Sequence, residues 1–343
     1  MPISPESTKL RSKSIERNAG QFADYDNLLI FGPPESDDLS YLKPKKVITF
    51  DYRVFQSHQS SLGECIEYSW QQSESQAYDA VIIFVPKSKK ELDLVLALVT
   101  PMLVKGASIY LVGEKKAGIE SAAKRLSAFG SKNSKIDSAK HCQLWQVSLE
   151  VEVKPFCLAD WVETFNIEIN DISVKLVSIP GVFSFGQLDI GTELLLENMF
   201  SRLDGRVLDF GCGSGVVGIY TKLLNPSIQL EMVDINILAL ECAKQSCDLN
   251  KIDAKVYPSD GWKGVQGRVN AVVSNPPFHS GVATEYRTTE GFIKGAKDKM
   301  SKHAPFLLVA NSFLKYAQII EDTFERCDIL AENTKFKVYK TFR

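Results

Sequence analysis

The chain has 343 residues, of which 44% are hydrophobic and 24% charged, and its formal net charge is −2 at pH 7. This composition is typical of globular proteins, and the length favours two domains. The charge balance excludes a globally basic nucleic-acid binder but allows a local basic patch. No stretch reaches the roughly 18 uncharged apolar residues of a membrane span, and the polar start lacks the apolar segment of a signal peptide. We therefore expect a cytoplasmic protein without membrane contact.

Seven cysteines are scattered along the chain, and no two of them form a C-x-x-C pair. An odd, scattered set in a long chain argues against both a zinc site and a disulfide framework. We expect reduced, mostly structural thiols and no bound metal. The residues are Cys65, Cys142, Cys157, Cys212, Cys242, Cys247 and Cys327.

The first half of the chain contains four short apolar runs that predict β-strands. They are rich in β-branched residues and end in turn-forming residues. The runs are NLLIFGPPES (27–36), KVITFDYR (46–53), YDAVIIFVPKSK (78–89) and GASIYLVGE (106–114).

A basic stretch covers residues 101–148, which contain eight Lys and Arg residues and three acids. Such a stretch is either a solvated helix surface or a surface that contacts RNA phosphates, and the sequence leaves both possibilities open. The candidate RNA contacts are Lys115, Lys116, Lys124 and Arg125.

The second half alternates strand-like and helix-like segments. Its helix-like segment ILALECAKQSCDLN (237–250) has apolar residues at helical spacing. Alternation of this kind predicts a mostly parallel sheet with helices on both faces. The strand-like runs are VKLVSIPG (174–181), RVLDFG (206–211), IQLEMVD (228–234), VNAVVSNPPF (269–278) and PFLLVAN (305–311).

The two halves repeat one order of elements. NLLIFGPPES aligns with RVLDFGCGSG, and the three other runs of the first half align with later runs in the same order. From the first loop glycine to the aspartate after the second strand there are 19 residues in one half (Gly32 to Asp51) and 23 in the other (Gly211 to Asp234). We infer one α/β fold used twice.

The N-terminal copy differs where chemistry is expected. It has Pro33 and Pro34 where the second copy has close glycines, and proline offers no N–H to a ligand. It also has Val85 where the second copy has Asn275. We predict a degenerate domain over residues 1–155 and a catalytic domain over residues 156–343, with the segment around 150–175 joining them.

The segment VLDFGCGSGVVG (207–218) has two interpretations. Its last three glycines match the G-x-G-x-x-G fingerprint of a dinucleotide fold, but Gly211 and Cys212 would then be extra residues after the strand. In the other interpretation the glycine backbone approaches S-adenosylmethionine, and Asp209 at the strand end meets the ammonium group of that ligand. Only this interpretation gives Asp209 a role. In it, Gly218 is a residue of close helix packing and not part of a phosphate-binding loop.

Two more aspartates follow predicted strands. Asp234 is placed to bind ribose hydroxyls of either cofactor, although it could instead be the N-cap of the following helix. Asp260 could accept a hydrogen bond from an adenine amino group, or it could be an ordinary turn residue before Gly261.

The motif SNPPF (274–278) follows a buried strand, at the sheet edge where open α/β folds bind ligands. The Asn275 side-chain oxygen and the Pro276 carbonyl would be fixed acceptors for both hydrogens of an exocyclic amine. Such holding favours the tetrahedral nitrogen that attacks a methyl group. Phe278 offers a face on which a base can stack. An Asn-Pro turn with a core phenylalanine is the alternative.

Together DFGCGSG, the aspartate at 234 and NPPF resemble class I S-adenosylmethionine-dependent methyltransferases that act on exocyclic nitrogens. The string PGVFSFGQLDIGTELLL (180–196) and the tandem arrangement are similar to the ribosomal RNA small subunit methyltransferase C family over nearly the whole chain. The resemblance implies two Rossmann-like methyltransferase domains and N2-methylation of one guanine in 16S rRNA of the small ribosomal subunit.

The resemblance also assigns roles to residues. It implies that the methionine end of the cofactor lies against Asp209, Gly211, Cys212 and Gly213, its ribose against Asp234 and its adenine against Asp260. The guanine would be held by Asn275, Pro276 and Phe278, with His279 beside it. Phe183 would close over the site, and Asp189, Gly191 and Thr192 would brace the cofactor.

The sequence is also compatible with three other functions. One is methylation of another exocyclic or amide nitrogen, such as adenine N6 or a protein glutamine. The second is a nicotinamide-dependent oxidoreductase, and the third is a ribosome-binding protein without activity. A monomer is expected.

Overall fold

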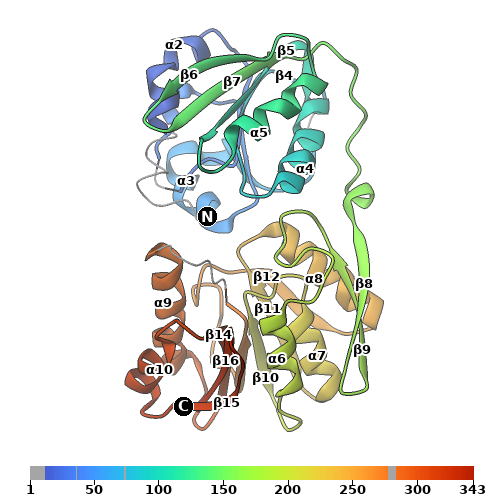
Figure 1. Cartoon of the computed structure of the whole chain (residues 1–343), viewed down its shortest axis with the longest axis vertical. Helices are drawn as coiled ribbons and strands as arrows, with labels where there is room; N and C mark the ends of the chain where they lie inside the picture. The colour runs from blue at the N-terminus through green and yellow to red at the C-terminus, as the bar shows by residue number, and fades with distance from the viewer. Residues whose placement is uncertain (1–11, 36, 73–74, 277–282) are drawn as a thin grey trace. The chain divides into compact units, whose positions relative to one another are not determined.

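The computed structural model describes residues 12–35, 37–72, 75–276 and 283–343 (Figure 1). The chain divides into two compact units, an N-terminal unit (Met1–Trp161) and a C-terminal unit (Val162–Arg343). Each contains a seven-stranded sheet with helices against it. Among the described residues, no helix combines the length and the apolar character that crossing a membrane would need.

The two sheets have the same strand order. In the N-terminal unit it is β3-β2-β1-β4-β5-β7-β6, and in the C-terminal unit β12-β11-β10-β13-β14-β16-β15. In both, five parallel strands are followed by an antiparallel pair. The prediction of one α/β fold used twice is therefore confirmed.

The N-terminal unit contains short helices and strands whose bounds follow. They are α2 (Ala19–Phe22), β1 (Leu28–Phe31), β2 (Lys46–Thr49), α3 (Tyr52–Leu62), β3 (Ile66–Tyr68), β4 (Tyr78–Phe84), α4 (Lys89–Val99), β5 (Leu103–Glu114), α5 (Ile119–Ala123), β6 (Ser134–Ala139) and β7 (Cys142–Ser148).

The C-terminal unit contains longer helices. Its elements are β8 (Glu163–Ile169), β9 (Ile172–Ser178), α6 (Ile190–Glu197), β10 (Arg206–Phe210), α7 (Val216–Leu224), β11 (Gln229–Asp234), α8 (Ile237–Asn250), β12 (Ala254–Pro258), β13 (Ala271–Ser274), α9 (Ala283–Lys299), β14 (Pro305–Asn311), α10 (Tyr316–Phe324), β15 (Asp328–Glu332) and β16 (Phe336–Phe342).

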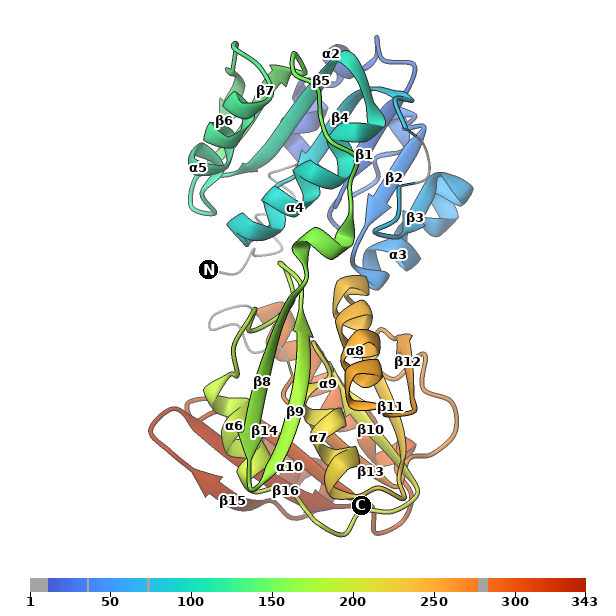
Figure 2. The same ribbon diagram turned by 90° about the vertical axis from the view of Figure 1, so that its right-hand side faces the viewer.

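One predicted sheet strand lies elsewhere. The run VKLVSIPG forms β9, whose one partner among the described strands is β8, in an antiparallel hairpin. This hairpin lies against α7 and α8 (Figure 2), where the Val177 N–H donates to Ser246 Oγ at 2.9 Å. The apolar residues of β9 are buried against helices. The sequence pattern of a strand is the same whether its apolar residues are buried against helices or within a sheet.

Each unit contains an equivalent hydrogen bond at the start of its central strand. In the N-terminal unit the Asp79 carboxylate accepts the Asn27 N–H at 3.2 Å, just before β1. In the C-terminal unit the Asn270 side-chain oxygen accepts the Arg206 N–H at 3.0 Å, at the start of β10. The equivalent positions show that the two folds match in detail as well as in strand order.

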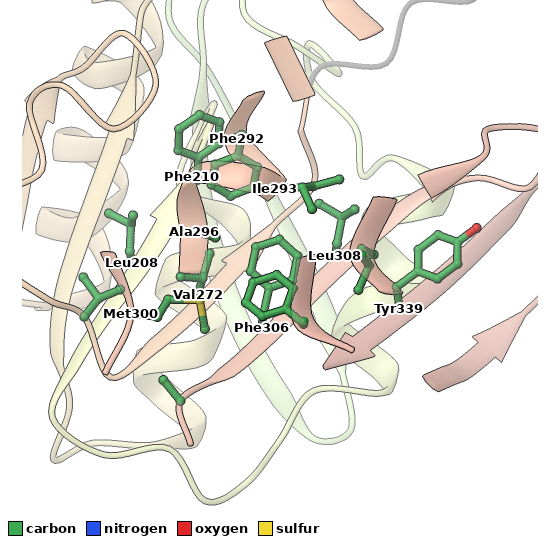
Figure 3. Packing of buried hydrophobic residues seen from close by; sticks show 14 of the residues in the cluster. Leu208, Phe210, Val272, Phe292, Ile293, Ala296, Met300, Phe306, Leu308 and Tyr339 are labelled. Atoms are coloured by element: carbon green, nitrogen blue, oxygen red, sulfur yellow. The ribbon is translucent and has the colours of Figure 1, made fainter. Parts of the chain in front are cut away.

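The core of the C-terminal unit fixes which residues of β10 face which layer. Leu208 and Phe210 join Phe292 of α9 and Phe306 of β14 in one buried cluster (Figure 3). The Phe210 and Phe292 rings stack with centroids 3.7 Å apart. Because side chains alternate along a strand, Asp209 faces the opposite layer, which contains α7.

Candidate active site at the carboxyl edge of the second sheet

The glycine loop after β10 is held against β11. The N–H groups of Gly211 and Cys212 both donate to the Val233 carbonyl, at 2.9 and 3.0 Å. Gly211, Gly213 and Gly215 have φ of 69°, 53° and 83°. Side-chain-bearing residues are disfavoured in this left-handed region, so the glycines allow the loop to turn directly into α7. A Cβ added at Gly213 would meet no atom within 4 Å, so the space beside its backbone is open to a ligand.

Gly218, in the first turn of α7, is a packing residue. Its N–H donates to Asp209 Oδ2 at 2.8 Å. A Cβ at this position would lie 2.7 Å from Met232 Sδ and 3.0 Å from the same carboxylate oxygen. The close approach of α7 to the sheet therefore accounts for glycine at position 218. The match to the G-x-G-x-x-G fingerprint does not require a bound dinucleotide.

Asp209 is buried and only partly satisfied. The residue is 1% exposed, and its Oδ1 has no hydrogen-bond partner among the described residues. Burial raises the pKa of Asp209 to about 7, and the charge of Asp234 adds to the rise, against the bond from Gly218. A buried carboxylate oxygen without a donor is costly, so this position favours a ligand that brings a cation or a hydrogen-bond donor.

Asp234 lies at the end of β11 and contacts the glycine loop. Its Oδ2 accepts the Gly213 N–H at 3.0 Å, and its Oδ1 accepts the Asn236 N–H at 2.9 Å. Asn236 is the N-cap of α8, since its side chain accepts the Leu238 N–H. The alternative role of Asp234 as the cap of this helix is therefore wrong.

Asp260 follows β12 at the same sheet edge. The neighbouring Ser259 N–H donates to the Asp234 carbonyl at 3.1 Å, which brings the two aspartate-bearing turns together. The Asp260 carboxylate forms an ion pair with Lys263 at 2.5 Å. Because Lys263 is largely exposed, this pair restricts access to Asp260 only weakly.

Asn275 follows β13, beside β10. The preceding Ser274 is fully buried, and its hydroxyl donates to the Phe210 carbonyl at 2.7 Å. Asn275 itself donates from Nδ2 to Thr192 Oγ1 at 2.7 Å and to Asp189 Oδ2 at 3.2 Å. Pro276 is buried. The predicted site residues Phe278 and His279 lie outside the described residues.

The run 180–196 supplies the partners of Asn275. Asp189 is the N-cap of α6 and accepts the Thr192 N–H at 2.9 Å. Asp189 and Thr192, which the resemblance placed against the cofactor, thus contact Asn275. Gly191 is required by packing, since a Cβ there would lie 2.8 Å from the Phe336 ring. Phe183, in the loop before α6, is 56% exposed.

The sequence did not identify this contact or the bond from Ser274. Asp189 does carry a local signal, because an aspartate before an apolar helical run is typical of an N-cap. Nothing local connects it with Asn275, which is 86 residues away.

The N-terminal unit lacks the same features at equivalent positions. Ile30, fully buried in β1, stands where β10 has Asp209. The Pro34 carbonyl is bound by the His58 ring at 2.7 Å. The alignment of Asp51 with Asp234 is wrong: Ile30 pairs with Val47 as Asp209 pairs with Met232, so Thr49 stands at the position of Asp234. Asp51 matches Asn236 instead; it caps α3 and pairs with Arg53 at 2.8 Å. Between β1 and β2 the described residues contain a single 3-10 turn (Ser40–Leu42) where the C-terminal unit has α7.

The strand register also corrects the alignment of Asn275. Ile30 pairs with Ile82, and Asp209 pairs with Val273. Counting two residues onward, the counterpart of Asn275 is Phe84, which is 3% exposed, and not Val85 as the sequence suggested. An apolar core residue therefore replaces the amide.

The basic residues differ in how available they are. Lys115, Lys116 and Lys124 are exposed. Arg125 is half-buried and bound through two guanidinium nitrogens to the Asp93 carboxylate. Its charge is therefore largely compensated within the fold, which makes it a weaker candidate for phosphate contact than the lysines.

The cysteine side chains are consistent with structural thiols. Cys142, Cys212, Cys242 and Cys247 are buried, and all seven cysteines are free. Burial raises the pKa of Cys242 and Cys247 to about 12, so these thiols stay protonated at neutral pH. The described residues contain no group of three or more His, Cys, Asp or Glu side chains arranged to hold a metal ion.

Comparison with known proteins agrees with this geometry. Residues 12–165 match the model of the methyltransferase small domain N-terminal family, and residues 173–340 match the methyltransferase small domain family. The fold is similar to that of the T. thermophilus 16S rRNA N2 guanine methyltransferase, solved with AdoMet and guanosine, with a TM-score of 0.82 and 21% identity over 92% of this chain and 88% of that chain.

Relatives of higher identity cover almost the whole chain. The chain is 38% identical to ribosomal RNA small subunit methyltransferase C of Aeromonas hydrophila, over 96% of both sequences. It is 37% identical to the Psychromonas ingrahamii protein of the same name, over 95% of both. These matches and the doubled fold identify the chain as a member of the ribosomal RNA small subunit methyltransferase C family, with two tandem Rossmann-like methyltransferase domains.

Proposed function

We propose that this protein transfers a methyl group from S-adenosylmethionine to the exocyclic N2 of a guanine in 16S rRNA of the small ribosomal subunit. The observation that carries the proposal is the fixed amide of Asn275 beside the glycine loop and Asp209. Membership of the ribosomal RNA small subunit methyltransferase C family supports the choice of substrate.

The residues around the glycine loop fit the cofactor. The unpartnered buried oxygen of Asp209 fits its ammonium group, and the open space beside Gly213 accommodates its amino-acid end, together with Gly211 and Cys212. Asp234, whose carboxylate accepts the Gly213 and Asn236 N–H groups at the end of β11, would bind the ribose hydroxyls. Asp260, in the adjacent turn, would bind the adenine amino group.

The residues after β13 act on the guanine. Asn275 Oδ1 and the Pro276 carbonyl accept the two hydrogens of N2, which favours the tetrahedral nitrogen over the planar ground state. When bound, S-adenosylmethionine supplies the electrophilic methyl group. Neither acceptor is a strong base, so the proton lost by the methylated nitrogen passes to solvent. In this proposal Phe278 stacks on the base, with His279 beside it, and Phe183 closes over the pocket.

The N-terminal unit serves RNA docking. The exposed Lys115, Lys116 and Lys124 can neutralise phosphates, which supply most of the affinity for a nucleic acid. The domain division 1–155 and 156–343 assigns docking and structural support to the first part and catalysis to the second. The protein would act as a cytoplasmic monomer, and sedimentation in solution measures that oligomeric state.

Methyl transfer with defined substrates tests the proposal. The protein is incubated with labelled S-adenosylmethionine and with small subunits, large subunits or free 16S rRNA, and the modified base is mapped. Label at guanine N2 of 16S rRNA is expected. Label confined to protein, adenine or the large subunit contradicts the proposal. Asn275→Ala is the control variant, which should bind S-adenosylhomocysteine and transfer no methyl group.

A further inference from the structure

The amide of Asn275 is part of a closed hydrogen-bonded triangle with the first turn of α6. Its Nδ2 donates to Thr192 Oγ1 at 2.7 Å and to Asp189 Oδ2 at 3.2 Å. The Thr192 hydroxyl lies 3.4 Å from the same Asp189 oxygen and donates to it. Both hydrogens of the Asn275 amide therefore have acceptors within this turn.

The chemistry of the acceptors fixes the direction of the amide. An ionised carboxylate has no hydrogen to give, and the hydroxyl hydrogen of Thr192 is directed to Asp189. A rotated Asn275 would place its oxygen against the Asp189 carboxylate, where two acceptors repel each other. Nδ2 must therefore point to α6, and Oδ1 must point away from it. No described residue donates a hydrogen bond to Asn275 Oδ1.

Both sides of this contact are anchored. The Asp189 carboxylate is held by the Thr192 N–H at 2.9 Å as the N-cap of α6. Gly191 lets this turn pack against Phe336, since its hypothetical Cβ would lie 2.8 Å from the ring. On the other side, the Ser274 hydroxyl ties the end of β13 to β10. Such anchoring preorganises an acceptor without reorganisation during the reaction.

We propose that Asp189 and Thr192 are positioning residues that hold Asn275 with its oxygen toward the substrate, so that the site accepts an amino group and disfavours a carbonyl. This inference rests on the proposed function. Donation of the amide hydrogens to a carboxylate also polarises the amide and makes Oδ1 a stronger acceptor. In guanine this arrangement favours N2, a donor, over O6, an acceptor.

Two variants separate positioning from helix capping. Asp189→Ser keeps an N-cap, because serine caps nearly as well as aspartate, but its hydroxyl can donate to a rotated amide. Thr192→Val removes the hydroxyl at nearly constant volume, and Thr192→Ser is the conservative rescue. Asp51→Ala is the control in the N-terminal unit, where it removes a cap from α3.

The expected result is a loss of kcat with little change in binding. Asp189→Ser and Thr192→Val should lower kcat on small subunits about tenfold to a hundredfold, with KM and S-adenosylhomocysteine affinity within about threefold. Thr192→Ser should recover most of kcat. Asp51→Ala should lower the melting temperature without a comparable change in kcat.

A second readout does not depend on activity. In the wild-type protein, the side-chain N–H₂ signals of Asn275, identified by their loss in Asn275→Asp, should exchange slowly with solvent. Exchange should become faster in Asp189→Ser and Thr192→Val. The proposal is overturned if both variants keep wild-type kcat and slow exchange. Failure of the wild-type protein to methylate guanine N2 contradicts the proposed function instead, while the exchange measurement still tests the orientation of Asn275.

Discussion

The backbone N–H of Gly218 donates a 2.8 Å hydrogen bond to one oxygen of Asp209, and the other oxygen of that carboxylate has no partner among the described residues. The hydrogen bond accounts for the close approach of Gly218 to the sheet, and the oxygen without a partner accounts for an aspartate at this buried position. Asp209 is held in place by the fold while half of its hydrogen-bonding capacity is left for a ligand.

The state of Asp209 predicts a pH-dependent affinity for the cofactor. Burial raises its pKa to about 7 in the free protein, and an ammonium group binds the ionised form. Affinity for S-adenosylhomocysteine should therefore fall by about tenfold between pH 7.5 and pH 6. Calorimetry in buffers of different ionisation enthalpy should also detect proton release on binding near pH 6.5.

Asp209→Asn is the control for this effect. It should weaken binding and abolish the dependence below pH 7.5. It should also change the stability of the ligand-free protein. Since the folded state of the wild type keeps a proton on Asp209 up to about pH 7, and the unfolded chain loses it near the ordinary value of 3.8, wild-type stability falls as pH rises between those values. As the pH rises over that interval, the stability of Asp209→Asn relative to the wild type should therefore increase. If the stabilities of the two proteins depend on pH in the same way, the raised pKa of Asp209 is contradicted.

Gly218→Ala tests the close approach of α7. Alanine normally favours a helix by about 1 kcal/mol over glycine, but here its Cβ would lie 2.7 Å from Met232 Sδ. We expect a loss of about 1–3 kcal/mol in the free energy of unfolding, together with weaker cofactor binding, since Asp209 is displaced. The matched substitution Gly291→Ala in α9, where a Cβ meets nothing within 4 Å, should be neutral or stabilising. Both are measured by denaturant unfolding.

The exposed lysines of the N-terminal unit should contribute to RNA affinity. Replacing Lys115, Lys116 and Lys124 together by Glu should weaken binding to small subunits and reduce its salt dependence, with S-adenosylhomocysteine affinity unchanged. Lys302→Glu, at an exposed position of the C-terminal unit, is the control for charge reversal outside the N-terminal unit. Unchanged RNA binding in the triple variant would rule out this docking surface.

Arg125 calls for a different expectation from the lysines. It is bound to Asp93, so Arg125→Glu places two carboxylates together and should lower stability as well as RNA binding. For this reason only the lysine variants test RNA contact cleanly, and a melting curve of Arg125→Glu measures the structural part.

Glu231 should contribute pH-dependent stability to the second sheet. Burial by itself raises its pKa, but hydrogen bonds from Arg206 and Tyr257 outweigh burial and hold the pKa below its ordinary value of 4.5. The bonds measure 2.8 Å from Arg206 and 2.7 Å from Tyr257. Glu231→Gln should cost about 2–4 kcal/mol at pH 7, because Arg206 is left poorly paired. That difference should shrink as the pH falls below 4.5, as thermal unfolding from pH 7 to pH 3 would show.

Local patterns predicted much of this protein. The segment ILALECAKQSCDLN forms α8 over the predicted residues, and the runs around the glycine loop form β10 and β11. Helical spacing and β-branched runs report burial of one stripe or one strand, and both are properties of neighbouring residues. The repeat of these patterns was enough to predict the doubled fold.

Other features depended on contacts between distant segments. The pattern of β9 could not distinguish burial in a sheet from burial against helices, so its pairing with β8 was missed. The shift from Val85 to Phe84 required the strand register, since adjacent apolar residues look alike in sequence.

The sequence by itself determined the doubled α/β fold, the glycine loop with Asp209, and Asn275 as the central polar residue of the second motif. Only the tertiary structure decided that Asp209 has one satisfied oxygen and one open oxygen, that Arg125 is bound to Asp93, and that Asp189 and Thr192 contact Asn275. The physical reason is that residue type sets which hydrogen bonds a side chain can form. Which of those bonds are already made within the protein, and which remain for a ligand, depends on partners that folding brings from elsewhere in the chain.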